Sequence, residues 1–206
     1  MFRNYESTDI RKKQISDAAA KIIIKYGSEH VTTKKIAREV GISETAIYRH
    51  FKSKIELLAF LIGDVETILL SEIELEPTSS YTLETLERII QTHIAKIVQR
   101  KGISFQVIAE IISLGSKKLN FQAYKVINNY TGQIKEILKR GREAGVIRWD
   151  IDLDAAATMF FGMTQGLVNT WALCQYSFDL EEKFISMWNI FRDSIISKDV
   201  INSDIV

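Results

Sequence analysis

Apolar residues recur at intervals of three and four along almost the whole chain, and a single proline, Pro77, interrupts them. This spacing places apolar side chains on one face of an α-helix, whereas a half-buried strand needs strict alternation. Proline breaks helix interiors, so a chain of 206 residues with one proline can form long helices. The pattern predicts an all-α fold.

Capping residues and glycines divide this pattern into about nine helices. Ser, Thr and Asp favour helix N-termini because their side chains accept hydrogen bonds from free amides, and glycine favours C-termini. The segment 77–80 is the one stretch with the composition of a linker. The expected helices span approximately 9–26, 33–40, 44–50, 54–76, 82–101, 103–114, 118–143, 153–175 and 180–197.

Positive charge is concentrated near the N-terminus, although the net charge is only +1. Residues 1–55 contain 12 basic and 6 acidic side chains, whereas the other 151 residues contain 15 and 20. Such asymmetry is typical of a segment that faces a polyanion such as DNA. On charge alone, a solvated basic surface without a partner is an equal alternative.

Other features indicate the compartment and argue against catalysis. The single cysteine, Cys174, cannot form an intrachain disulfide, and the N-terminus lacks the apolar core of a signal peptide. No run reaches the roughly 18 apolar residues of a membrane span. The three histidines are scattered, and motifs of phosphate loops or nucleophile elbows are missing. We therefore expect a cytoplasmic protein without a membrane partner, cofactor, metal or enzymatic activity.

Two short expected helices, 33–40 and 44–50, are joined by a turn that contains Gly41. This is the arrangement of a helix-turn-helix, in which the turn residue often has a positive φ that glycine adopts at little cost. Apolar residues such as Ile36 and Ile47 supply its small core. The second helix keeps a polar N-terminal end that can approach base edges in the major groove.

The run from Val31 to Lys54 resembles the DNA-binding signature of the TetR family. The matching features are the Thr32-Thr33 entry, the Ile36-Ala37 pair, the Gly41-Ile42-Ser43 turn, Tyr48-Arg49-His50-Phe51 and Lys54. The resemblance covers residues 10–60, and the rest of the chain matches in length and helical content. It implies a helix-turn-helix DNA-binding domain in residues 1–54, a connecting helix that starts over 54–76, and a larger helical effector-binding and dimerisation domain in residues 55–206.

The resemblance also implies the residues that contact DNA. Those expected to bind the phosphate backbone are Thr33, Tyr48, His50 and Lys54, and those expected at the base-reading end of the recognition helix are Ser43, Glu44 and Thr45. Lys34 is expected to contact a base or a phosphate, and Arg49 belongs to the same set. Glu44 departs from the family pattern, in which lysine or a neutral residue is common. Its carboxylate can accept from cytosine N4, or it is a solvated residue favoured by the helix dipole.

The last two helices are expected to form a homodimer interface, as in the family. The expected contact residues are Met159, Gly162, Gly166, Trp171, Phe184, Trp188 and Phe191. Two glycines one turn apart allow helices to approach closely, and four helices would meet across a twofold axis. The alternative is that these residues pack only within the monomer.

A pocket for a small, lipophilic effector is expected from the same resemblance. Its candidate residues combine an apolar stripe with a few polar groups: His93, Gln106, Glu110, Phe121, Tyr124, Asn128, Thr131 and Met163. A mainly apolar lining with few polar groups suits a small-molecule site. The competing interpretation is that the aromatic stripe and the histidine belong to the core.

Two functions remain open at this point. The first is a sequence-specific transcriptional regulator, a repressor that binds a palindromic operator and is released by the ligand. The second is a DNA binder that organises the chromosome or recruits a protein, because residues 43–51 are similar to those of a nucleoid-occlusion member of the family, which recruits a cell-division protein. A large cavity in the second domain favours the first function, and a closed core favours the second.

Overall fold

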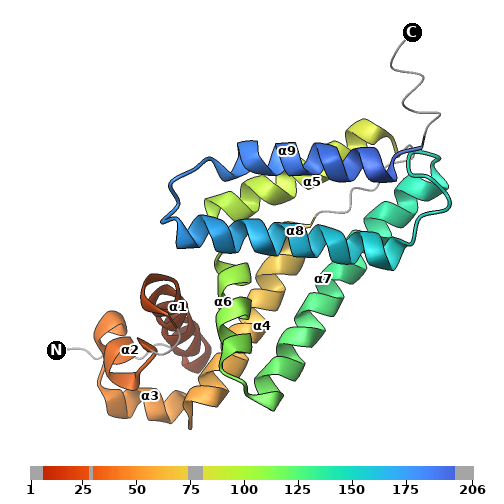
Figure 1. Cartoon of the computed structure of the whole chain (residues 1–206). Helices are drawn as coiled ribbons and strands as arrows, with labels where there is room; N and C mark the ends of the chain where they lie inside the picture. Colours follow the sequence, from red (N-terminus) through yellow and green to blue (C-terminus); the bar gives the residue numbers. More distant parts are fainter. Residues whose placement is uncertain (1–6, 28–29, 74–80, 198–206) are drawn as a thin grey trace. The chain divides into compact units, whose positions relative to one another are not determined.

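The computed structural model describes residues 7–27, 30–73 and 81–197, and these residues form nine α-helices (Figure 1). The helices are α1 (Thr8–Tyr26), α2 (Thr33–Val40), α3 (Glu44–His50), α4 (Lys54–Glu72), α5 (Leu83–Gln99), α6 (Ile103–Ser113), α7 (Lys117–Glu143), α8 (Leu153–Leu173) and α9 (Leu180–Ile195). The all-α prediction is confirmed. The predicted linker 77–80 lies outside the described residues.

Polar caps fix where several of these helices begin. The side chains of Ser43, Thr82, Asp152 and Asp179 accept hydrogen bonds from amides in the first turns of α3, α5, α8 and α9, as predicted. The N-cap of α2 is Thr32, whose Oγ1 accepts a hydrogen bond from the amide of Lys35 at 3.2 Å. A cap of this kind stabilises a helix by about 1 kcal/mol.

Two glycines are required by the backbone. Gly41 ends α2 with φ +75°, in the left-handed region, and its N–H donates to the carbonyl of Ala37. Gly102, between α5 and α6, has φ +60°, and a Cβ atom there would lie 2.3 Å from Cγ1 of Val168. Gly41 therefore permits the turn of the helix-turn-helix, and Gly102 permits close packing on α8.

The chain forms two compact units. The N-terminal unit comprises residues 1–67 and 106–126, and the C-terminal unit comprises residues 68–105 and 127–206. The boundaries fall inside α4, α6 and α7. The division of function after residue 54 stays a prediction.

In the N-terminal unit, α1 packs against α2 and α3. Its apolar face is buried, and its polar face is tied to α4 because Asp64 accepts hydrogen bonds from Ser16 Oγ at 2.7 Å and Lys13 Nζ at 3.3 Å. These contacts hold α1 in place against α2 and α3. The position of α1 therefore fixes the direction in which α3 exposes its polar residues.

In the C-terminal unit, α9 packs against α8 and α5 (Figure 1). Phe160 of α8 lies at the centre of an aromatic cluster, with its ring centroid 6.0–6.4 Å from those of Phe184, Trp188 and Phe191 of α9. Edge-to-face aromatic pairs add stability beyond the area that they bury. None of the helices in the described ranges has a stretch apolar and long enough to cross a membrane.

Candidate nucleic-acid interface

The entry of α2, the end of α3 and the start of α4 surround one groove of about 410 Å³. Three residues expected to bind DNA phosphates, Thr33, Tyr48 and Lys54, line this groove although they are 15 and 6 residues apart along the chain. Their hydroxyl and ammonium groups are the donors that phosphate oxygens accept from. The groove therefore has the chemistry of a backbone-binding site.

Buried residues explain why these donors face outward. Ile47 of α3 is 1% exposed, whereas the next residue, Tyr48, is 55% exposed. Phe51 follows α3 and is buried in the core, with its ring centroid 5.5 Å from that of Phe60. Lys12 Nζ of α1 lies 5.7 Å from the Phe51 centroid, so a cation–π contact holds this lysine close to the end of α3.

The remaining recognition-helix residues form a polar surface. Thr45 and Arg49 are exposed on α3, and Lys34 is exposed on α2. Ser43 is exposed, but its Oγ accepts from the amide of Ala46 at 3.2 Å, so it serves first as the helix cap. A capping hydroxyl keeps its own proton available for donation to DNA.

Glu44 has a partner that the sequence did not reveal. Its Oε2 accepts a hydrogen bond from Thr33 Oγ1 at 3.1 Å. The bond joins the first residue of α3 to the first residue of α2. No local pattern signals such a contact between residues eleven positions apart, because it depends on how the two helices cross.

His50 lies half-buried at the end of α3 among positive charges. Burial lowers its pKa from the ordinary value, and the charges of Arg11, Lys12 and Arg49 lower it further. The neutral imidazole is therefore favoured in the free protein. A phosphate placed here would reverse the effect, since an anion stabilises the imidazolium.

The first aromatic residues of the predicted stripe on α7 are exposed. Phe121 and Tyr124 are 60% and 62% exposed, so they do not line an enclosed pocket. The face that α7 buries includes Leu119, Ala123, Val126, Tyr130, Ile134, Ile137 and Leu138. In the first half of α7 two faces fit a helical period, and packing buries the one without Phe121 and Tyr124.

His93 is a core histidine. It is 1% exposed, and its Nε2 lies 2.7 Å from the hydroxyl oxygen of Tyr130, which is completely buried. The rings of Tyr130 and Phe160 stand 5.6 and 6.4 Å from the His93 ring. Sequence reasoning missed Tyr130, although it occupies the buried register of α7.

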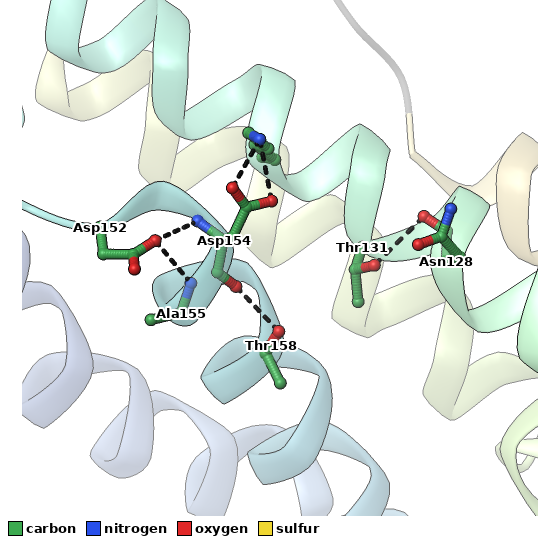
Figure 2. A network of polar contacts seen from close by, with 7 residues as sticks. Asn128, Thr131, Asp152, Asp154, Ala155 and Thr158 are labelled. Atoms are coloured by element: carbon green, nitrogen blue, oxygen red, sulfur yellow. Dashed lines mark hydrogen bonds and ion pairs between the residues drawn. The ribbon is translucent and has the colours of Figure 1, made fainter.

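The other predicted pocket residues are dispersed. Figure 2 shows Thr131 beside Asn128 on α7, where the threonine hydroxyl donates to the Asn128 carbonyl at 3.1 Å and Asn128 is exposed. Gln106 is buried and Glu110 half-buried, and both belong to the N-terminal unit. Met163 lines a groove of about 690 Å³ along α8 and α9. The structure thus does not assemble the eight predicted residues into one described cavity.

The predicted dimer interface divides into two sets. Trp171, Phe184, Trp188 and Phe191 are 2–7% exposed, so they serve the core of the unit and have little surface to offer a partner. Met159 is 61% exposed, and Gly162 and Gly166 line the groove along α8 and α9.

Two exposed apolar residues were missed at this face. Ile190 of α9 is 75% exposed and Leu173 of α8 is 84% exposed. The sequence does not identify them as exposed, because α8 and α9 have apolar residues on more than one face.

Two family models match the chain. Residues 15–60 match the model of bacterial regulatory proteins of the tetR family. Residues 67–192 match the C-terminal region of YsiA-like proteins. The family whose model matches the helix-turn-helix consists of regulators rather than enzymes.

Whole-chain relatives agree with these matches. The nucleoid occlusion factor SlmA of Vibrio atlanticus is 24% identical over 187 residues, which are 90% of this chain and 95% of the relative. A TetR-family regulator from Agrobacterium tumefaciens has the same fold, with a TM-score of 0.77 and 20% identity over 93% of this chain and 100% of that one. FadR from Bacillus subtilis follows with a TM-score of 0.69 and 24% identity over 90% and 97%. The chain belongs to the TetR family of DNA-binding bacterial regulators.

Proposed function

We propose that this protein is a cytoplasmic repressor that binds a palindromic operator as a homodimer and leaves it when a small lipophilic ligand binds the C-terminal unit. The observation that supports it most is the groove that Tyr48 of α3 and Lys54 of α4 line together. These two donors lie beside the polar face of α3.

In this proposal α3 enters the major groove of the DNA, and Tyr48 and Lys54 bind the flanking phosphates. The polar residues at the start of α3 then face base edges, and the phosphate contacts set the register. A dimer would place two recognition helices in successive major grooves, ~34–36 Å apart along B-DNA. The operator would then share the twofold symmetry of the protein.

The α8–α9 face supports the dimer. A Cβ atom added at Gly162 or Gly166 would meet nothing within 4 Å in its own chain, so packing within the chain does not require these glycines. Small residues let a second chain approach closely, and the exposed Met159 and Ile190 offer apolar area on the same two helices. An isologous contact of this face with its copy closes a dimer.

The nature of the ligand is inferred from relatives and from the core. The C-terminal region matches that of YsiA-like proteins, and the similar Bacillus subtilis FadR was solved with stearoyl-CoA. The core of the C-terminal unit is largely aromatic and contains a buried polar pair, His93 with Tyr130. A mainly apolar lining of this composition suits an acyl chain.

The test uses the full chain and a duplex selected by it from a random pool. Stearoyl-CoA is added to the complex, and coenzyme A alone is the control. We expect stearoyl-CoA to release the DNA and coenzyme A to leave it bound. If a series of acyl-CoA chain lengths leaves the complex intact, acyl-CoA release is excluded while operator binding stands.

A second candidate is a DNA binder that acts on the chromosome without a ligand. It is favoured by the similarity to nucleoid occlusion factors, which extends over 90% of this chain. Mapping of bound sites across the genome separates the two. Many dispersed sites insensitive to acyl-CoA support this candidate, whereas a few sites at promoters support the repressor.

A further inference from the structure

The hydrogen bond between Thr33 and Glu44 conflicts with the role that the family resemblance gives to Thr33. That resemblance implies a phosphate contact, yet Thr33 Oγ1 donates to Glu44 Oε2 at 3.1 Å. A hydroxyl has one proton to donate. While Thr33 donates to Glu44, it has no proton left for a phosphate oxygen.

The packing of α2 against α3 fixes the backbone positions of Thr33 and Glu44. Ile36 of α2 and Ile47 of α3 are each 1% exposed, and their packing holds the two helices together. Glu44 itself is exposed, and a glutamate on a surface samples several rotamers about its three side-chain torsions. The bond from Thr33 restricts that freedom and gives the carboxylate a direction.

A directed carboxylate can recognise one type of base edge. An ionised carboxylate only accepts hydrogen bonds, so the N4 amine of cytosine is its matching partner in the major groove. Guanine O6 and N7 and thymine O4 are acceptors and repel it, and adenine places the acceptor N7 beside its N6 donor. Since Thr33 donates to Oε2, the other oxygen, Oε1, keeps both of its lone pairs for the base.

The negative charge also makes this contact selective. Glu44 is an acid in a segment rich in basic residues, and DNA phosphates repel it on every sequence. Only a donor at the facing base offsets that repulsion. Specificity arises in this way when one group is attractive to the correct partner and repulsive to the others.

We propose that Thr33 is a positioning residue, which holds the Glu44 carboxylate for cytosine N4, and that base readout by Glu44 depends on this bond. The inference rests on the proposed binding of operator DNA. It replaces phosphate binding by Thr33 and leaves Tyr48 and Lys54 in that role.

The base pair that Glu44 reads is first identified as the position at which Glu44→Ala loses its sequence preference. Binding of the full chain is then measured to the selected duplex and to the three duplexes that carry another base at that position. Thr33→Val removes the hydroxyl and keeps the shape, and Thr33→Ser keeps the hydroxyl. We expect Thr33→Val to reduce discrimination for cytosine about tenfold, within the range of a good base contact. Thr33→Ser should retain it, and Thr33→Val should add nothing in the Glu44→Ala background.

A matched control is Thr158→Val, because the Thr158 hydroxyl donates to the carbonyl of Asp154 on its own helix at 2.8 Å, far from α3 in the sequence (Figure 2). It should leave the ratios of the four dissociation constants unchanged, and thermal unfolding checks that all variants fold. The proposal is overturned if Thr33→Val weakens the four duplexes equally in both backgrounds, since that is the behaviour of a phosphate donor. Failure of the wild-type chain to prefer any duplex refutes operator binding itself.

Discussion

Helices α2 and α3 bury one or two apolar residues each, whereas α8 and α9 bury seven and five and still expose large apolar side chains. In α2 and α3, the residues outside the small core are almost all polar, so the exposed residues are largely the ones expected to bind DNA. In α9 the consecutive residues Ile190 and Phe191 are 75% and 5% exposed. A helix that is apolar on more than one face has the surface for two partners, one inside its own chain and one outside.

The comparison teaches where a sequence pattern carries functional information. Polar residues on a short, capped helix contribute little to packing, so their chemistry indicates which ligand the helix binds. Apolar residues on a long helix can pack in the core or contact a partner, and only the packed structure shows which of the two each residue does.

Trp188→Ala should destabilise the fold by about 3–5 kcal/mol, because it empties a site in the aromatic cluster around Phe160. Ile190→Ala, on the same helix, should cost much less in a monomeric fold, because that side chain is 75% exposed. Denaturant unfolding at low protein concentration measures both. Equal losses would contradict the assignment of Trp188 to the core and Ile190 to the surface.

Ile190→Asp should weaken the dimer by about tenfold or more, since it would bury an unpaired carboxylate against the second chain. Tyr124→Asp is the matched control, because Tyr124 is 62% exposed on α7, outside the proposed face. Sedimentation equilibrium over a range of concentrations gives the dissociation constants. A variant that dimerises as tightly as the wild type removes Ile190 from the interface.

Lys54→Ala should weaken binding to all duplexes and lower the slope of log affinity against log salt by about one unit, as expected for one lost phosphate contact. Lys139→Ala is the control, because Lys139 lies in α7 within reach of Glu136 and Glu143. Titrations at four salt concentrations give the slope. If the slope stays the same, Lys54 does not neutralise a phosphate.

DNA affinity should rise as the pH falls toward and below the ordinary histidine range, by about two- to fivefold. The pKa of His50 is lowered in the free protein, chiefly by burial and also by three cations, so the neutral form dominates there. A phosphate raises the pKa again, and binding therefore takes up a proton. His50→Gln should remove this component of the pH dependence, and a profile unchanged by the substitution would exclude His50 as its source.

Much of the fold could be predicted from the sequence, because caps and glycines act locally. Asp152 and Asp179 start α8 and α9 as expected, and Gly41 has the positive φ expected of the turn. The donors of the groove beside α3 were named from the family resemblance, because Thr33, Tyr48 and Lys54 stand at positions of its signature.

The remainder depends on contacts between distant residues. Tyr124 and Tyr130 of α7 both fit a helical period, and only packing decides that Tyr130 is buried and Tyr124 exposed. Its partner His93 lies 37 residues away, beyond the reach of any periodicity. The bond from Thr33 to Glu44 arises in the same way, from the crossing of two helices.

The central claim is that α3 and the groove beside it bind one DNA sequence in preference to others. It is tested by measuring, at one salt concentration, the affinity of the full chain for a duplex selected from a random pool and for a scrambled duplex of equal length. The account predicts two chains per selected duplex and a preference of at least about 1,000-fold. Equal affinity for the two duplexes would contradict it.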